Sequence, residues 1–261
     1  MIDIINAKKE FKNYVANYNP EHPRVALKIS HILRVAENCR VIAESLNLSE
    51  EEIKLAELIG IFHDLGRFEQ VRIADTFSDR DSKINHAEQS VKVLFEEGLI
   101  RRFIEEETYD NVIRKAVYNH NRAGIEDGLT EKELLFAKII RDADKLDIFY
   151  SMNFEEFEAM CWYKNFDQDE IGELEIEDIR NRRLVNYANI KNNADMITIF
   201  YGYIFDLNFE VSLKIVAEHN YLEQFTERIK KNFKSEKIHK QADQILEICN
   251  EFINEKIKEI N

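Results

Sequence analysis

The sequence has very little proline and glycine, 2 and 7 residues in 261. These residues punctuate strands and tight turns, so their scarcity predicts long helices joined by short polar loops, which is an all-α fold. Cysteine is also rare, and its three widely spaced residues are expected to be reduced thiols: Cys39, Cys161 and Cys249. No apolar run approaches the ~18 residues of a membrane helix, and no apolar signal-peptide region opens the chain. We therefore expect a cytoplasmic protein with no membrane partner.

Positive charge is scarce as well. The chain carries 36 Lys and Arg against 50 Asp and Glu, a net charge of −14. A uniformly acidic protein repels phosphate backbones, so we expect no nucleic-acid partner. A small phosphorylated ligand stays compatible with this charge, because a bound cation can reverse the local field. With 44% hydrophobic residues the chain can bury a sizeable core, which excludes wholesale disorder.

Helical periodicity is what the sequence does contain. Apolar residues recur at helical spacing in five segments between residues 22 and 150, which predicts five helices there. Two of these helices begin with a capping-box pattern, in which a Ser or Thr is followed three residues later by Glu. The two pairs are Ser49 with Glu52 and Thr130 with Glu133.

Two glycines and one segment without helical periodicity separate these predicted helices. The second helix is expected to stop at Gly66 and the third at Gly98, because glycine favours the backbone that follows a helix. Residues 67–85 have no sustained period and are predicted to form a long loop. The chain has no Pro/Gly/Ser linker. We expect a helical core over residues 1–150 and a C-terminal helical extension over residues 151–261 packed on it.

The extension is helical and rich in aromatic residues. The aromatic stretch after Asp195 is more typical of a core than of a wall against a nucleotide base. The tail carries an apolar face made of Ile238, Ala242, Ile245, Cys249 and Phe252. Fewer than three heptads favour packing of this face within the chain, and a homodimer through the C-terminal helices is the alternative.

Polar residues interrupt apolar helix faces that should be buried. They come from four helices and less clearly from a fifth, and they are His31, His63, Asp64, His86, His120 and Asp144. A single histidine on such a face is more often a satisfied core residue than a ligand. A buried unpaired carboxylate, however, is costly or becomes protonated, so two aspartates and up to four histidines indicate a shared cation. Imidazole and carboxylate together suit divalent Mn, Fe, Co, Ni or Zn, and Mg is a further candidate.

The text around three of these residues resembles a known family. "SHILRVA" contains His31, "GIFHDLGRFE" contains His63, and "DADKLD" contains Asp144. Together they resemble the H…HD…D pattern of the HD-domain metal-dependent phosphohydrolase superfamily, over about residues 22–150. The resemblance implies an HD-type helical bundle whose first metal is held by His31, His63, Asp64 and Asp144.

The resemblance extends to a second metal. Binuclear members of the superfamily have two more histidines, and His86 in "NHAEQ" and His120 in "YNHN" stand where these would be. Asp64 would then be the bridging carboxylate, and we expect one or two divalent metals per chain, with two favoured. One departure is "HDLGR" in place of the "HDIGK" of several binuclear members. Arg67 keeps the positive charge but presents a planar fork instead of a point charge.

The resemblance implies metal-dependent hydrolysis of a phosphate ester or anhydride. Divalent metals activate water near neutral pH and grip the oxygens of a phosphoryl group. The expected substrate is a small phosphorylated metabolite, with a nucleotide favoured. Asp64, Arg67 and Lys145 are the candidate catalytic residues, although both cations are equally consistent with solvated surface charges. Candidates for orienting the substrate, or for ordinary hydrophilic helix flanks, are Asn119, Asn121 and Asp147.

Other activities of similar proteins stay open. The same ligand set serves a mixed-valent di-iron oxygenase in a few proteins that resemble this superfamily. A non-catalytic module that senses nucleotides is disfavoured, because such a module would be free to lose ligands. Nucleases are disfavoured by the acidic charge, and the GYP motif of the branch best known for cyclic-dinucleotide hydrolysis is missing. Three histidines fit no part of the pattern: His22, His219 and His239.

Overall fold

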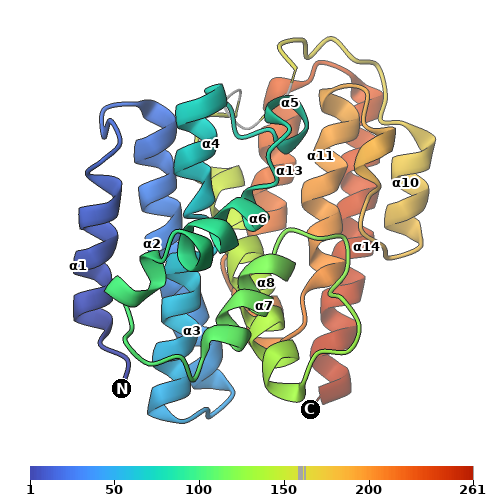
Figure 1. Ribbon diagram of the computed structural model, residues 1–261. Coiled ribbons are helices and arrows are strands. Elements are labelled where there is room, and N and C mark those ends of the chain that lie inside the picture. Colours follow the sequence, from blue (N-terminus) through green and yellow to red (C-terminus); the bar gives the residue numbers. More distant parts are fainter. Residues whose placement is uncertain (158–160, 162, 261) are drawn as a thin grey trace. The chain divides into compact units, whose positions relative to one another are not determined.

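Helices joined by turns make up the computed structural model, which describes residues 1–157, 161 and 163–260 (Figure 1). These residues contain no strand, which confirms the predicted all-α class. The chain divides into two compact units, Met1–Asp144 and Lys145–Asn261. The helix α8 (Glu131–Phe154) contributes residues to both units.

The first unit is built around the pair of helices α2 and α3. Gly60 on α3 allows their close approach, since a Cβ there would lie 2.5 Å from the Cα of Ala36 on α2. Besides α8, the helices of this unit are α1 (Ile4–Val15), α2 (Pro23–Ser45), α3 (Glu50–Phe62), α4 (Gly66–Ala74), α5 (Asp79–Ser82), α6 (His86–Val91) and α7 (Asp110–Asn119). A π-helical turn (Lys92–Glu96) and a 3-10 turn (Leu99–Arg102) follow α6.

Both predicted capping boxes are present. The amide of Ser49 donates to Glu52 over 3.3 Å, and the Ser49 hydroxyl accepts from the Glu52 amide over 3.4 Å. The amide of Thr130 donates to Glu133 over 2.8 Å, and the Thr130 hydroxyl accepts the return bond over 3.3 Å. The predicted end at Gly98 is also confirmed, because the π-helical turn finishes at Glu96 and Gly98 has φ of +74°.

Two predictions for this unit are wrong. α3 ends at Phe62, and Gly66 begins α4 instead of stopping a helix. Residues 67–85 are not one long loop, because α4 runs to Ala74 and the short helix α5 follows. The buried face of α4 combines Phe68 and Val71 with the fully buried Gln70, and this polar member hides the apolar period.

The second unit is a separate group of helices. With the end of α8 it contains α10 (Glu173–Arg180), α11 (Asn193–Gly202), α12 (Glu210–Glu218), α13 (Tyr221–Asn232), α14 (Glu236–Ile260) and two 3-10 turns (Tyr187–Asn189 and Tyr203–Asp206). α14 packs against α10, α11, α12 and α13. Its predicted apolar face is buried apart from the half-exposed Phe252, which contacts Phe205. Tyr201 and Phe225 from the aromatic segments are also buried in this unit.

Cys39 and Cys249 are buried free thiols, as the sequence predicts. Within the described part of the chain, every helix is too short or too polar to cross a bilayer.

Candidate metal centre

Six ligand-type side chains meet inside the first unit, and they are the six that the sequence singles out. α2 supplies His31, α8 supplies Asp144, and the ends of α3 and α7 supply His63 with Asp64 and His120. His86 is the first residue of α6. Asp144 is the most accessible of them, with 19% of its side chain exposed.

One group of ligand atoms surrounds the Oδ2 atom of Asp64. His31 Nε2 lies 3.4 Å from this oxygen and His63 Nε2 lies 3.5 Å from it. The two imidazole nitrogens are 3.2 Å apart, and Asp144 Oδ1 lies 3.3 Å from His31 and 3.9 Å from His63. Ligand atoms about 2.1 Å from a shared ion are themselves spaced by roughly 3 to 3.5 Å, so this spacing fits a metal site.

A second group surrounds the other oxygen of the same carboxylate. Asp64 Oδ1 lies 3.5 Å from His86 Nε2 and 3.6 Å from His120 Nε2, and these nitrogens are 3.1 Å apart. The Oδ1 atom is buried and accepts no hydrogen bond from a described residue. Asp64 therefore offers one oxygen to each group, which is the arrangement of a bridging carboxylate.

Hydrogen bonds on the far side of the rings fix the imidazole tautomers. His63 Nδ1 donates to the carbonyl of Gly60 and His120 Nδ1 donates to the carbonyl of Val117, each over 2.7 Å. His86 Nδ1 lies 2.7 and 2.9 Å from the carboxylate oxygens of Asp79. Since carbonyls and carboxylates only accept, each neutral ring carries its proton on Nδ1 and directs an Nε2 lone pair into the cluster.

The protonation states of the buried groups match those of metal ligands. Burial lowers the pKa of His63, and burial together with the Arg67 charge lowers the pKa of His86 to about 3. Burial alone would raise the pKa of Asp64, but the Lys28 ammonium and the surrounding histidines hold it well below its usual range. Burial would likewise raise the pKa of Asp144. The hydrogen bond and the charge of His31 outweigh this effect, so the pKa of Asp144 also lies below its usual value. The neutral imidazoles of His63 and His86 thus face ionised carboxylates at neutral pH.

The cluster contains a cation that sequence reasoning missed. Lys28 Nζ lies 2.6 Å from Asp64 Oδ2, and it also lies 5.4 Å from the centre of the Phe77 ring. Lys28 precedes His31 by three residues on α2, so the two side chains lie on the same helix face. This spacing is the feature of the sequence from which Lys28 could be predicted to lie near the ligands.

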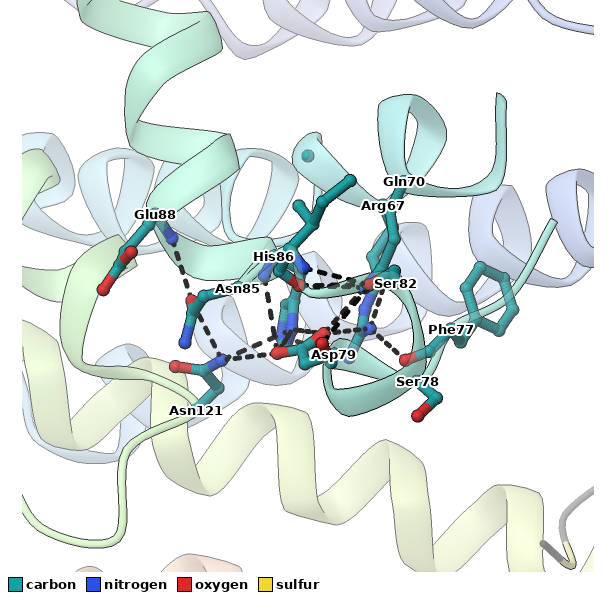
Figure 2. A network of polar contacts seen from close by, with 12 residues as sticks. Arg67, Gln70, Phe77, Ser78, Asp79, Ser82, Asn85, His86, Glu88 and Asn121 are labelled. Atoms are coloured by element: carbon teal, nitrogen blue, oxygen red, sulfur yellow. Dashed lines mark hydrogen bonds and ion pairs between the residues drawn. The ribbon is translucent and has the colours of Figure 1, made fainter. Parts of the chain in front are cut away.

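Arg67 lies beside His86 of the second group of ligands (Figure 2). Its Nη1 donates to the carbonyl of Phe77, to Gln70 over 2.7 Å and to Asp79 over 2.9 Å. Its Nη2 lies 3.2 Å from His86 Nε2, and its Nε is buried 3.6 Å from Asp64 Oδ1. This candidate catalytic residue therefore directs its donors into the protein.

The other predicted polar residues have varied surroundings. Lys145 is buried in the second unit, where its Nζ lies 2.7 Å from Asp206, and Asp147 is buried there too. Asn119 bonds the carbonyl of Lys115 and the amide of Glu126, so it supports the turn after α7. Asn121 approaches a candidate ligand, with its Nδ2 lying 3.3 Å from His86 Nδ1.

Comparison with known proteins finds one family model that covers this cluster. The model of the HD domain family matches residues 29–148, a range that contains all six candidate ligands. The match confirms the resemblance found in the sequence and agrees with the all-α fold. No curated protein and no solved structure matches the chain significantly.

Proposed function

From the HD domain of residues 29–148, we propose that the protein is a metal-dependent phosphohydrolase of a small phosphorylated metabolite, and that a nucleotide is its substrate. One observation carries this proposal. Three atoms that only accept hydrogen bonds converge at the second group: the Nε2 lone pairs of His86 and His120 and the buried Oδ1 of Asp64. Facing acceptors repel one another, and a shared divalent cation removes that repulsion.

The candidate ligands divide into two sets. The first ion would be held by His31, His63, Asp64 and Asp144, and the second by Asp64, His86 and His120. Divalent ions bound in this way supply a nucleophile at neutral pH and stabilise the charge of a transferring phosphoryl group. The fixed Nδ1 donors keep the ligand lone pairs oriented, so the site needs little reorganisation to bind its ions.

Among the nearby cations, Lys28 is the best placed to pair with a phosphate oxygen. Arg67 is directed towards Asp79 and His86, and Lys145 towards Asp206. Lys28 forms an ion pair with Asp64 and lies over the half-buried Phe77 ring. A flexible ammonium can exchange a carboxylate for a phosphate without rearrangement of the backbone.

The proposal is tested by metal content and phosphate release together. Purified protein is analysed for metals, reconstituted with Mn²⁺, Co²⁺, Ni²⁺ or Fe²⁺, and incubated with nucleoside monophosphates, nucleoside triphosphates and sugar phosphates. We expect two metals per chain and phosphate release that Asp64→Ala abolishes. The matched control is Gly124→Ala, because a Cβ at that position enters open space.

Two other results of this experiment would support one of the alternative functions. Two irons with oxygen consumption and no phosphate release would refute the proposal in favour of an oxygenase. Absence of metal after reconstitution would refute it in favour of a module that only binds its ligand.

A further inference from the structure

Asp79 is the centre of a polar network that includes His86 of the second group of ligands (Figure 2). Its Oδ1 accepts from Arg67 over 2.9 Å and from Gln70 over 2.8 Å. Its Oδ2 lies 2.7 Å from His86 Nδ1 and 3.4 Å from Asn121 Nδ2. The backbone amide of His86 also points at Oδ2, over 3.4 Å. Every one of these neighbours is a donor, so the position requires a group that only accepts.

His86 needs this partner because of its place in its helix. His63 and His120 follow the last residues of α3 and α7, where Nδ1 reaches a helix carbonyl three residues back. His86 opens α6 and has no helix turn before it, so no such carbonyl is present. The acceptor comes instead from α5, seven residues away along the chain.

We propose that Asp79 is a positioning residue of the second metal site, which keeps the proton of His86 on Nδ1 and its Nε2 free to bind the ion. The inference rests on the proposed function, since it concerns the same site. Asp79 does not reach the cluster itself; it acts through His86 and through the Arg67 guanidinium that it holds beside that ring.

The neighbours of His86 Nε2 explain why the ring would otherwise change tautomer. His120 Nε2 lies 3.1 Å away and Asp64 Oδ1 lies 3.5 Å away, and both are acceptors. The third neighbour, Arg67 Nη2 at 3.2 Å, is a donor, and the bond from Arg67 to Asp79 holds it there. A proton on His86 Nε2 would satisfy one of the two acceptors, so a metal-free ring that lost Asp79, and with it the hold on Arg67, would favour the tautomer that cannot bind a metal. The carboxylate of Asp79 opposes this, because it requires a donor at Nδ1.

The isosteric substitution Asp79→Asn separates these effects. An amide group introduced among donors must face either His86 Nδ1 or the pair formed by Arg67 and Gln70. Facing the ring costs least, since a neutral imidazole can accept at Nδ1 and move its proton to Nε2. The side chain keeps its shape, while His86 loses the lone pair that would bind the metal.

The first measurement is the ¹⁵N NMR spectrum of the histidine rings in metal-free protein, with His86 assigned by His86→Gln. Protonated and unprotonated ring nitrogens differ clearly in chemical shift. We expect wild type to carry the His86 proton on Nδ1 and Asp79→Asn to carry it on Nε2. Asp81→Asn is the matched control, because Asp81 lies on the same short helix and its exposed side chain pairs with Arg80.

The second measurement is a Co²⁺ titration of each protein, followed by calorimetry and visible absorption. Loss of a partner that orients a metal-binding histidine typically costs 10–100-fold in affinity. We expect that loss at one of the two sites of Asp79→Asn, an unchanged first site, and two unchanged sites in Asp81→Asn. Retention of the first site also shows that the variant is folded.

The outcomes separate this inference from the proposed function. Asp79→Asn with two wild-type Co²⁺ affinities, or a wild-type His86 with its proton on Nε2, would overturn the inference and leave the phosphohydrolase proposal intact. Loss of both sites in a folded Asp79→Asn would also overturn it. Wild type that binds no Co²⁺ would instead overturn the proposed function. If Asp79→Asn does not fold, the wild-type tautomer decides.

Discussion

Gly66→Ala should remove the second metal and leave the first. A Cβ at residue 66 would lie 2.5 Å from the carbonyl oxygen of His86, 2.5 Å from the amide nitrogen of Ser90 and 2.8 Å from the carbonyl carbon of Gln89. All three atoms belong to the backbone of α6 and cannot rotate away. Ordinary contact begins at 3.4 Å, so α6 must move by about 0.9 Å (3.4 minus 2.5) relative to the start of α4.

That displacement is large for a metal ligand and moderate for the fold. Metal–ligand distances tolerate about 0.2 Å, so His86 would leave the second ion's coordination sphere while the first ion's ligands stay on α2, α3 and α8. Overpacking typically costs about 1–3 kcal/mol, and the better helix propensity of alanine returns up to about 1 kcal/mol. We therefore expect a folded protein destabilised by about 0–3 kcal/mol.

The assay is metal content and Co²⁺ affinity, with unfolding in urea as the check on the fold. Two substitutions serve as controls. Gly124→Ala should change neither site, and Gly60→Ala should weaken the first, because its Cβ would meet the Cα of Ala36 at 2.5 Å and separate the helices that carry His31 and His63. Two metals with wild-type affinity in Gly66→Ala would refute the reasoning.

The remaining predictions concern charge and protonation. Lys28→Met should tighten metal binding at the first site by about 10–100-fold. The Lys28 ammonium competes with the metal for Asp64, and a hydrogen bond to a charged group contributes about 1.5–3 kcal/mol. Weaker Co²⁺ binding of the variant, measured by calorimetry, would contradict this. Chelation should lower the melting temperature without unfolding the protein, because Lys28 still pairs with Asp64; unfolding by circular dichroism would count against it. Burial raises the pKa of Tyr201, so the unfolded chain loses that proton first, and stability should fall above about pH 10 by up to about 1.4 kcal/mol per pH unit. Tyr201→Phe should flatten that slope in urea unfolding at pH 9 to 11, and an unchanged slope would refute this assignment.

Local rules account for what could be predicted from the sequence. A capping box needs only residues three apart, and Ser49 with Glu52 forms one as expected. The helical period then places His31 on a buried face of α2, and Asp64 follows the buried His63 at the end of α3. These features depend on neighbours within one or two turns, so the pattern alone is sufficient to find them.

The parts that sequence reasoning missed depend on contacts between distant residues. Gln70 is polar yet fully buried, because Asp79 and Arg67 satisfy its amide, and neither contact is visible in a hydrophobic pattern. Glycine is typical of the position that follows a helix, but Gly66 is required for another reason. Its backbone lies against the backbone of Ser90, 24 residues away, where a side chain would not fit. α4 and α5 were therefore mistaken for a loop.

The two groups of ligands therefore depend on different parts of the sequence, and this affects how many metals a protein with the same ligand pattern can bind. The first group of ligands is carried by packed helices whose faces can be predicted. The second group requires in addition that the segment from Gly66 to His86 folds back, so that Asp79 reaches His86 Nδ1 and Gly66 lies against α6. A chain could keep every candidate ligand, lose Asp79 or Gly66, and bind a single metal. The number of bound metals should therefore depend more on whether Gly66 and Asp79 are present than on the number of histidines.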